Sequence, residues 1–169
     1  MIYLYISEST AFRLSFNINE IGRFSQCKLQ LVRGNVVENL SEDYLYVLVE
    51  EILGRIRNIP NLENRNAIGN IGKWQEYYYF DSEYNNKHAV EIETMEKAIF
   101  FSAEKYGSFL YKYDNKNWLE LNKSFCDSYS SSPVEYYSDP DNYRILLSCI
   151  SYEMVENWKK QLEVIEGQL

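Results

Sequence analysis

Nucleophilic catalysis of the serine or cysteine hydrolase type needs a base beside the nucleophile, and this chain contains a single histidine, His88. That histidine closes a polar stretch, Asp81 to His88, which is typical of a solvent-exposed turn. The sequence has no GxSxG, GxxxxGK(S/T) or GxGxxG pattern, so neither a nucleophile elbow nor a phosphate loop is expected. We therefore predict no catalytic residues and no enzymatic activity.

Paired carboxylates are the other source of acid and base chemistry. Glu91 and Glu93 would project from one face of a predicted strand, as the acid and base of a glycosidase do. Val90 and Ile92 alternate with them and define the buried side, so a solvated strand face explains the same pattern. A carboxylate-based hydrolase is accordingly the less favoured alternative.

Metal and disulfide chemistry are not expected either. Cys27, Cys126 and Cys149 are widely spaced and odd in number, which argues against a disulfide framework and against a Cys/His zinc site. The segment Asp139-Pro140-Asp141-Asn142 lacks the glycine and the terminal glutamate of a calcium loop and predicts a turn. We predict three free thiols, no metal and no cofactor.

Three runs of the chain combine acids with tyrosines and contain no Lys or Arg: Gly34 to Gly54, Trp74 to Asn86, and Ser124 to Tyr143. Acid beside tyrosine suits docking onto a basic protein, because charge steers the encounter and the ring adds contact area at low entropy cost. We draw the predicted partner-binding residues from the second and third runs. They are Asp127, Glu135, Tyr136, Tyr137, Asp139, Asp141, Tyr78, Asp81, Glu83 and Tyr84. The first run carries Glu38, Glu42, Asp43, Glu50 and Glu51 with Tyr44 and Tyr46.

The composition restricts the possible partners. Among 169 residues, 25 acidic against 17 basic side chains give a net charge of −8, which is unfavourable for binding nucleic acid or an anionic membrane. The segment Met1 to Ile6 lacks the charged start of a secretory signal, and no apolar run is long enough to span a bilayer. We predict a cytoplasmic protein with one domain over residues 1–169, and its oligomeric state stays open.

Period-two alternation predicts the strands. Phe12, Leu14, Phe16 and Ile18 alternate with polar residues and give the clearest strand pattern. Residues 20–33 fit both a helix and a strand, and both alternatives stay open. The tolerance of Asp114 to Asn117 for turn conformations predicts a β-hairpin over 109–121. Further strands are expected at Ile2–Ile6, Trp74–Phe80, Ala89–Thr94, Ala98–Ala103, Ser108–Tyr113 and Tyr143–Ile150.

Period-3.6 spacing predicts two long amphipathic helices. The first follows Ser41 as N-cap, with Glu42 and Asp43 in its first turn, and presents apolar residues from Leu45 to Ile56. The second runs from about Tyr152 to Glu166, is capped by Ser151 and ends at Gly167. Together these elements predict an α+β domain, with a mainly antiparallel sheet of six or more strands.

The chain resembles the immunity proteins of bacterial polymorphic toxin and contact-dependent growth inhibition systems. The resemblance lies in size, acidity, the lack of an active-site motif, and segments such as Tyr77-Tyr78-Tyr79-Phe80-Asp81 and Glu135-Tyr136-Tyr137-Ser138-Asp139. It implies a protein that binds and blocks a cognate toxin domain, often a basic nuclease. The alternative is a structural or regulatory subunit of a larger complex, for which an exposed apolar patch would be the sign.

Overall fold

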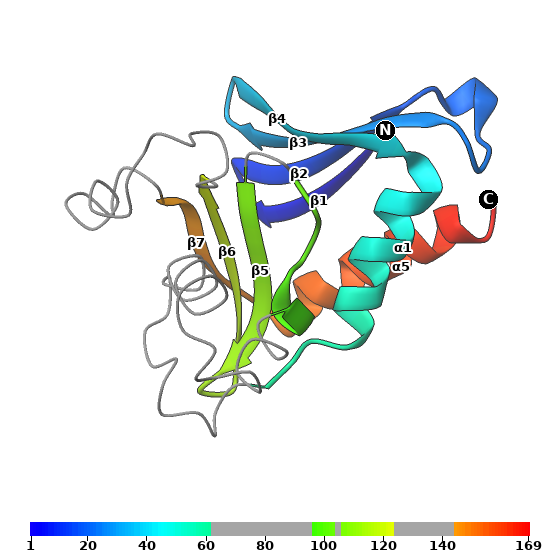
Figure 1. Cartoon of the computed structure of the whole chain (residues 1–169). Coiled ribbons are helices and arrows are strands. Elements are labelled where there is room, and N and C mark those ends of the chain that lie inside the picture. The colour runs from blue at the N-terminus through cyan, green and yellow to red at the C-terminus, as the bar shows by residue number, and fades with distance from the viewer. Residues whose placement is uncertain (62–95, 104–105, 124–143) are drawn as a thin grey trace, which may run out of the picture. The chain divides into compact units, whose positions relative to one another are not determined.

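The computed structural model describes residues 1–61, 96–103, 106–123 and 144–169 (Figure 1). The chain divides into two compact units, Met1–Asn58 with Ile150–Leu169, and Ile59–Cys149. Helices and antiparallel strand pairs both occur, which confirms the predicted α+β class. The single domain over residues 1–169 stays a prediction.

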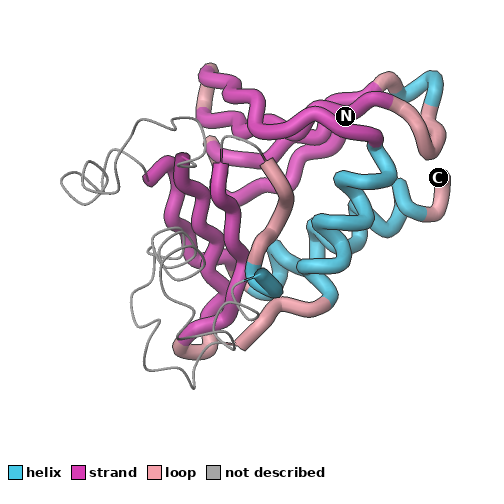
Figure 2. Tube along the Cα trace, in the orientation of Figure 1, coloured by secondary structure: helices cyan, strands magenta, loops and turns pink. Residues whose placement is uncertain are grey.

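The first unit contains a four-stranded antiparallel meander in the order β1-β2-β3-β4 (Figure 2). Its strands are β1 Ile2–Ser7, β2 Thr10–Phe16, β3 Gln26–Arg33 and β4 Val36–Tyr44. Leu4, Phe12 and Leu31 lie opposite one another across three strands and are all buried, so they define the inner face. The ambiguous segment 20–33 therefore ends in a strand, and the helical alternative is wrong.

Two helices lie side by side against the inner face of this sheet (Figure 1). They are α1 Leu45–Arg57 and α5 Tyr152–Glu166, each with its apolar residues buried along one side. The Ser151 hydroxyl accepts the N–H of Met154 at 3.2 Å, so α5 begins at the predicted cap. The indole N–H of Trp158 donates to the Tyr5 carbonyl at 2.9 Å and joins α5 to β1.

The start of α1 differs from the prediction. Ser41, Glu42 and Asp43 belong to β4 and not to a cap and first turn. The N-cap is Tyr44, which makes no side-chain capping bond, and no acid lies in the first turn. Glu42 and Asp43 instead occupy exposed positions of an edge strand, where water solvates their charges. Acidic residues are favourable both there and at a helix N-terminus, so their presence alone does not distinguish the two.

The second unit contains a three-stranded sheet in the order β5-β6-β7, formed by β5 Tyr106–Tyr113, β6 Lys116–Lys123 and β7 Arg144–Ile150. The predicted hairpin is confirmed, with Asp114 and Asn115 at φ 51° and 56° as its two turn residues. The described strands thus form two sheets and not the single sheet that the sequence predicts. β4 is an edge strand of the four-stranded sheet, and the chain passes from it directly into α1.

The predicted strand Ala98–Ala103 is wrong. Ala98, Phe100 and Phe101 are all buried, so the alternation of a half-buried strand is absent, and Ile99 makes one isolated bridge to Phe109. The predicted strands Trp74–Phe80 and Ala89–Thr94 lie outside the described residues. Within the described ranges, no helix has the length and apolar character needed to cross a membrane.

Candidate functional site

All ten predicted partner-binding residues fall within 62–95 and 124–143, outside the described residues, so that prediction stays untested. The base-free run Gly34 to Gly54 is described and covers β4 and most of α1. This run also combines acids with tyrosines. Its residue Leu45 contacts Ser25, which directly precedes β3. The candidate site is assembled at this junction.

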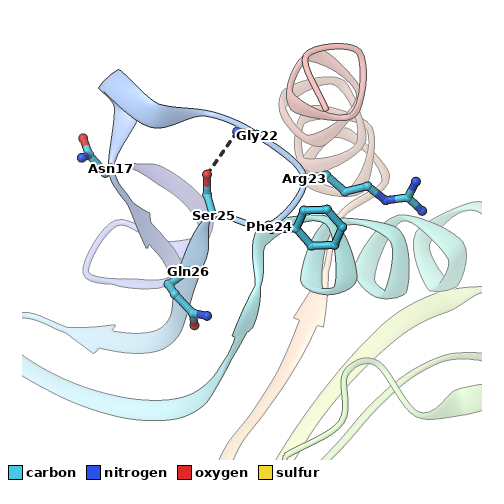
Figure 3. A pocket seen from close by; sticks show the side chains of 6 residues that line it. All are labelled: Asn17, Gly22, Arg23, Phe24, Ser25 and Gln26. Atoms are coloured by element: carbon cyan, nitrogen blue, oxygen red, sulfur yellow. Dashed lines mark hydrogen bonds between the residues drawn. The ribbon is translucent and has the colours of Figure 1, made fainter.

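A tight turn from Gly22 to Ser25 positions one side of the site (Figure 3). The Ser25 N–H donates to the Gly22 carbonyl at 3.0 Å, and the Gly22 N–H donates to the Ser25 hydroxyl at 3.1 Å. The first N–H of α1, from Leu45, then donates to the Ser25 carbonyl at 2.7 Å. Because the first N–H groups of a helix have no partner within it, this bond both satisfies one of them and ties the turn to α1.

Three aromatic side chains meet at this junction, and we call Phe24, Tyr44 and Tyr46 the aromatic cluster. The Phe24 ring stands edge-on to both tyrosine rings, with centroids 5.7 Å from Tyr44 and 5.9 Å from Tyr46. The two tyrosine rings are nearly parallel, 6.2 Å apart. These separations suit aromatic pairs, but Phe24 is 69% exposed and Tyr44 40% exposed. Such an exposed apolar group has the character of a contact surface.

A guanidinium group completes this surface. The Arg23 guanidinium carbon lies 4.8 Å from the centroid of the Tyr46 ring, within cation–π range. Figure 3 shows the Arg23 and Phe24 side chains leaving the turn toward α1, while Asn17 extends on the other side of the loop. Beside them is a hollow of about 560 Å³ lined by Asn17, Gly22, Arg23, Phe24, Ser25 and Gln26.

Exposed carboxylates flank the aromatic cluster. Glu42 and Asp43 directly precede Tyr44, and Glu50 lies one helical turn beyond Tyr46 on the same side of α1. Glu42 pairs with Lys28 at 3.6 Å, whereas Asp43 accepts the N–H of Tyr44 at 2.7 Å. Of these three carboxylates, Glu50 shares a side of α1 with Tyr46, so a negative charge and an aromatic ring lie on one side of the helix.

The second unit contains a different polar group, a carboxyl in a hairpin interior. Glu120 is fully buried; the Tyr111 hydroxyl donates to it at 3.3 Å and the Asn122 amide at 2.6 Å. All three side chains lie on one face of the β5–β6 hairpin, because residues two apart on a strand share a face. Buried polar groups need such partners, so these contacts give Glu120 a structural role in the hairpin. Among the described residues, no group of three or more metal-ligating side chains converges.

The sequence pointed to part of this site. Tyr44 and Tyr46 stood out in a base-free run. Phe24 and Arg23 did not, because they lie in the segment 20–33, for which helix and strand both stayed open. The usable signal was Gly22, a turn-forming residue just before them. Its position makes an exposed turn a better interpretation than a continuous helix.

Comparison with known proteins finds no matching family model, no similar curated protein and no similar solved structure.

Proposed function

We propose that this chain is a protein-binding module that docks onto a basic protein and that, as an immunity protein would, it neutralises a cognate toxin domain in the cytoplasm. The observation that carries the proposal is the exposed aromatic cluster, in which Phe24 meets Tyr44 and Tyr46 of the acidic, base-free run Gly34 to Gly54. Interfaces favour aromatic anchors at their centre, and complementary charge at the rim speeds association. Phe24, Tyr44 and Tyr46 supply the aromatic rings, and the acids within residues 42–50 supply the charge.

The charge of the chain supports a basic partner. The run Gly34 to Gly54 contains five acids and no base, and the whole chain carries a net charge of −8. Long-range attraction would therefore raise the rate at which a basic toxin domain meets this surface. The same charge disfavours nucleic acid as the ligand, because phosphates would be repelled.

A binding and neutralisation assay tests the proposal. The partner is the basic toxin domain encoded directly upstream of this chain, if such a gene is present, and surface plasmon resonance measures both rates. Joint charge reversal, Glu42→Lys with Asp43→Lys, should slow association and weaken its salt dependence. Phe24→Ala should mainly raise the dissociation rate. The loss of binding free energy should be roughly 1–3 kcal/mol, which is the range expected for an aromatic hot spot.

The control is Val164→Ala, which truncates a side chain of α5 that is 62% exposed and distant in sequence from the site. Unchanged binding and neutralisation in every site variant would place the interface elsewhere. The predicted tracts would then be tested through Tyr136→Ala and Tyr137→Ala, and through charge reversal at Asp139 and Asp141. Absence of a toxin gene nearby, together with no neutralisation of any basic toxin domain, would count against the proposal.

The alternative of a regulatory or structural subunit has one observation in its favour. Val36 and Val37, at the start of edge strand β4, are 60% and 45% exposed. A subunit interface would bury such apolar residues without needing a basic partner. Strong binding whose rate does not change with salt would favour this alternative over the toxin-binding function.

A further inference from the structure

We propose that the aromatic cluster is a binding site for a guanidinium group, and that Arg23 occupies part of this site until an arginine of the partner replaces it. This inference rests on the proposed function, because it names the side chain through which a basic partner docks. It assigns Arg23 the role of an internal competitor. It also makes arginine the preferred ligand over lysine.

The rings themselves carry the first step of the argument. A cation is attracted to an aromatic face when it lies within about 6 Å of the ring centroid. Arg23 meets that condition at Tyr46, so the cluster already holds a guanidinium within the free chain. Phe24 and Tyr44 remain 69% and 40% exposed, which leaves aromatic surface for a second group beside the first.

The way Arg23 is held makes it replaceable. Among the described residues, no carboxylate forms an ion pair with Arg23, and its guanidinium lies over the ring of Tyr46. Arg57 of the same unit is held differently, with hydrogen bonds of 2.7 and 3.0 Å to Glu166 and 3.3 Å to Glu163. A single exposed cation–π contact is weak, so an incoming guanidinium can displace Arg23 far more easily than it could displace Arg57.

The surrounding charge favours a cation as the occupant. Glu50 lies one turn from Tyr46 on α1, and Asp43 lies next to Tyr44 in the sequence. A guanidinium is planar and weakly hydrated, so it can stack on an aromatic ring through its flat face. An ammonium group is a compact and strongly hydrated charge without such a plane, so lysine should bind this site less well.

Nuclear magnetic resonance of the full chain tests the inference directly. The probes are the N-acetyl amides of arginine, lysine and glutamate, followed through the ring signals of Phe24, Tyr44 and Tyr46. Arginine amide should shift these signals at lower concentration than lysine amide does, and glutamate amide should not shift them. Arg23→Ala should tighten arginine binding about two- to fivefold, which is the effect of removing one exposed cation–π competitor.

Two variants should remove the binding: Tyr46→Leu, and Phe24→Leu as a second change at a more exposed position, in case the first disturbs folding. Arg57→Ala is the matched control, since it removes an exposed arginine of the same unit and should leave binding unchanged. Weaker arginine binding in Arg23→Ala, or preference for the glutamate probe, would overturn the inference by making Arg23 a contact residue. Equal response to lysine would overturn the guanidinium preference.

The two proposals can fail separately. If a basic toxin domain binds Tyr46→Leu as well as it binds the unmodified chain, and arginine amide shifts no ring signals, the guanidinium site is wrong and the proposed function stands. If arginine amide binds at the cluster but no basic toxin domain is neutralised, the site stands and the proposed function is wrong.

Discussion

The reactivity of Cys27 provides a test of β3, the strand that directly follows the turn with Arg23 and Phe24. Cys27 is the second residue of β3 and is 1% exposed, whereas Cys149 is exposed, and both are free thiols. Burial raises the pKa of the Cys27 thiol from 9.0 to about 12, against a backbone hydrogen bond with Ser15 and the charge of the N-terminus, both of which lower it. The thiolate is the reactive form, so Cys27 should resist alkylation.

The expected difference in rate follows from the ionised fraction. At about pH 8, a thiol with a pKa of about 12 is ionised to roughly one part in 10⁴. An ordinary exposed thiol with a pKa of 9.0 is about one tenth ionised under the same conditions. Ionisation alone therefore slows Cys27 by about 10³-fold relative to an ordinary thiol, and burial slows it further by excluding the reagent.

The assay is a time course of iodoacetamide labelling of the native chain, with each cysteine followed by peptide mass spectrometry. Cys149 serves as the internal exposed reference, and labelling in denaturant should modify all three cysteines of the chain. Cys27 reacting natively as fast as Cys149, with circular dichroism unchanged, would refute the inward orientation of Cys27 in β3. The raised pKa of Cys27 also makes stability depend on pH. Between about pH 9 and 12 the unfolded chain loses the thiol proton while the folded chain retains it, so the free energy of unfolding should fall as pH rises through this range.

Two further predictions concern stability, and a third concerns an ion pair. Trp158→Phe removes the donor to the Tyr5 carbonyl and should lower the unfolding free energy by about 1–2 kcal/mol. A urea titration measures this, and an unchanged midpoint would contradict a role for the hydrogen bond. Asn115→Val should lower the unfolding free energy by about 1 kcal/mol, because the φ of 56° at this position disfavours a branched side chain. Asn115→Gly is the control and should be tolerated, so equal thermal midpoints for the two variants would refute the prediction. The hydrogen bond from Arg57 lowers the pKa of Glu166, so its small contribution is present above the ordinary glutamate pKa and is lost as pH falls through the lowered value. Arg57→Ala should return that pKa toward its ordinary value in a carbon-detected titration, and no movement would rule out the pair in solution.

The elements that could be predicted are those specified by neighbouring residues. Helix α5 begins after Ser151, whose hydroxyl caps it locally, and ends at Glu166, directly before Gly167. The hairpin depends on two consecutive residues with positive φ, Asp114 and Asn115, which their side chains tolerate. In each case the physical cause lies within a few residues of its effect.

Strand β4 shows where local information was insufficient. Ser41 followed by two acids is favourable at a helix start, but the same residues are also favourable on the exposed side of an edge strand. What decides between them is pairing with β3, in which Lys28 lies opposite Glu42. That contact joins residues 14 positions apart and is not encoded in the spacing of either segment.

The aromatic cluster depends on the same kind of long-range pairing. Gln26 lies opposite Tyr44 in the β3–β4 register, which brings the preceding turn beside the start of α1. The bond from the Leu45 N–H to the Ser25 carbonyl then fixes Phe24 near both tyrosines. The sequence predicted a surface that combines tyrosines with acids. Only the register of β3 and β4 shows that the Phe24 ring lies beside Tyr44 and Tyr46.

The aromatic cluster lies apart from the core of the first unit. Leu45, Leu48 and Ile52 of α1 are at most 1% exposed and pack inward, while Phe24 and Tyr44 extend outward from the same junction. The turn that carries Phe24 is held by backbone atoms and one hydroxyl, so the exposed rings are ordered without being part of the core. Ordering before binding lowers the entropy lost when a partner docks. Under the proposed binding function, such a surface can change its aromatic and acidic side chains, and hence its partner, without altering the buried residues that stabilise the first unit.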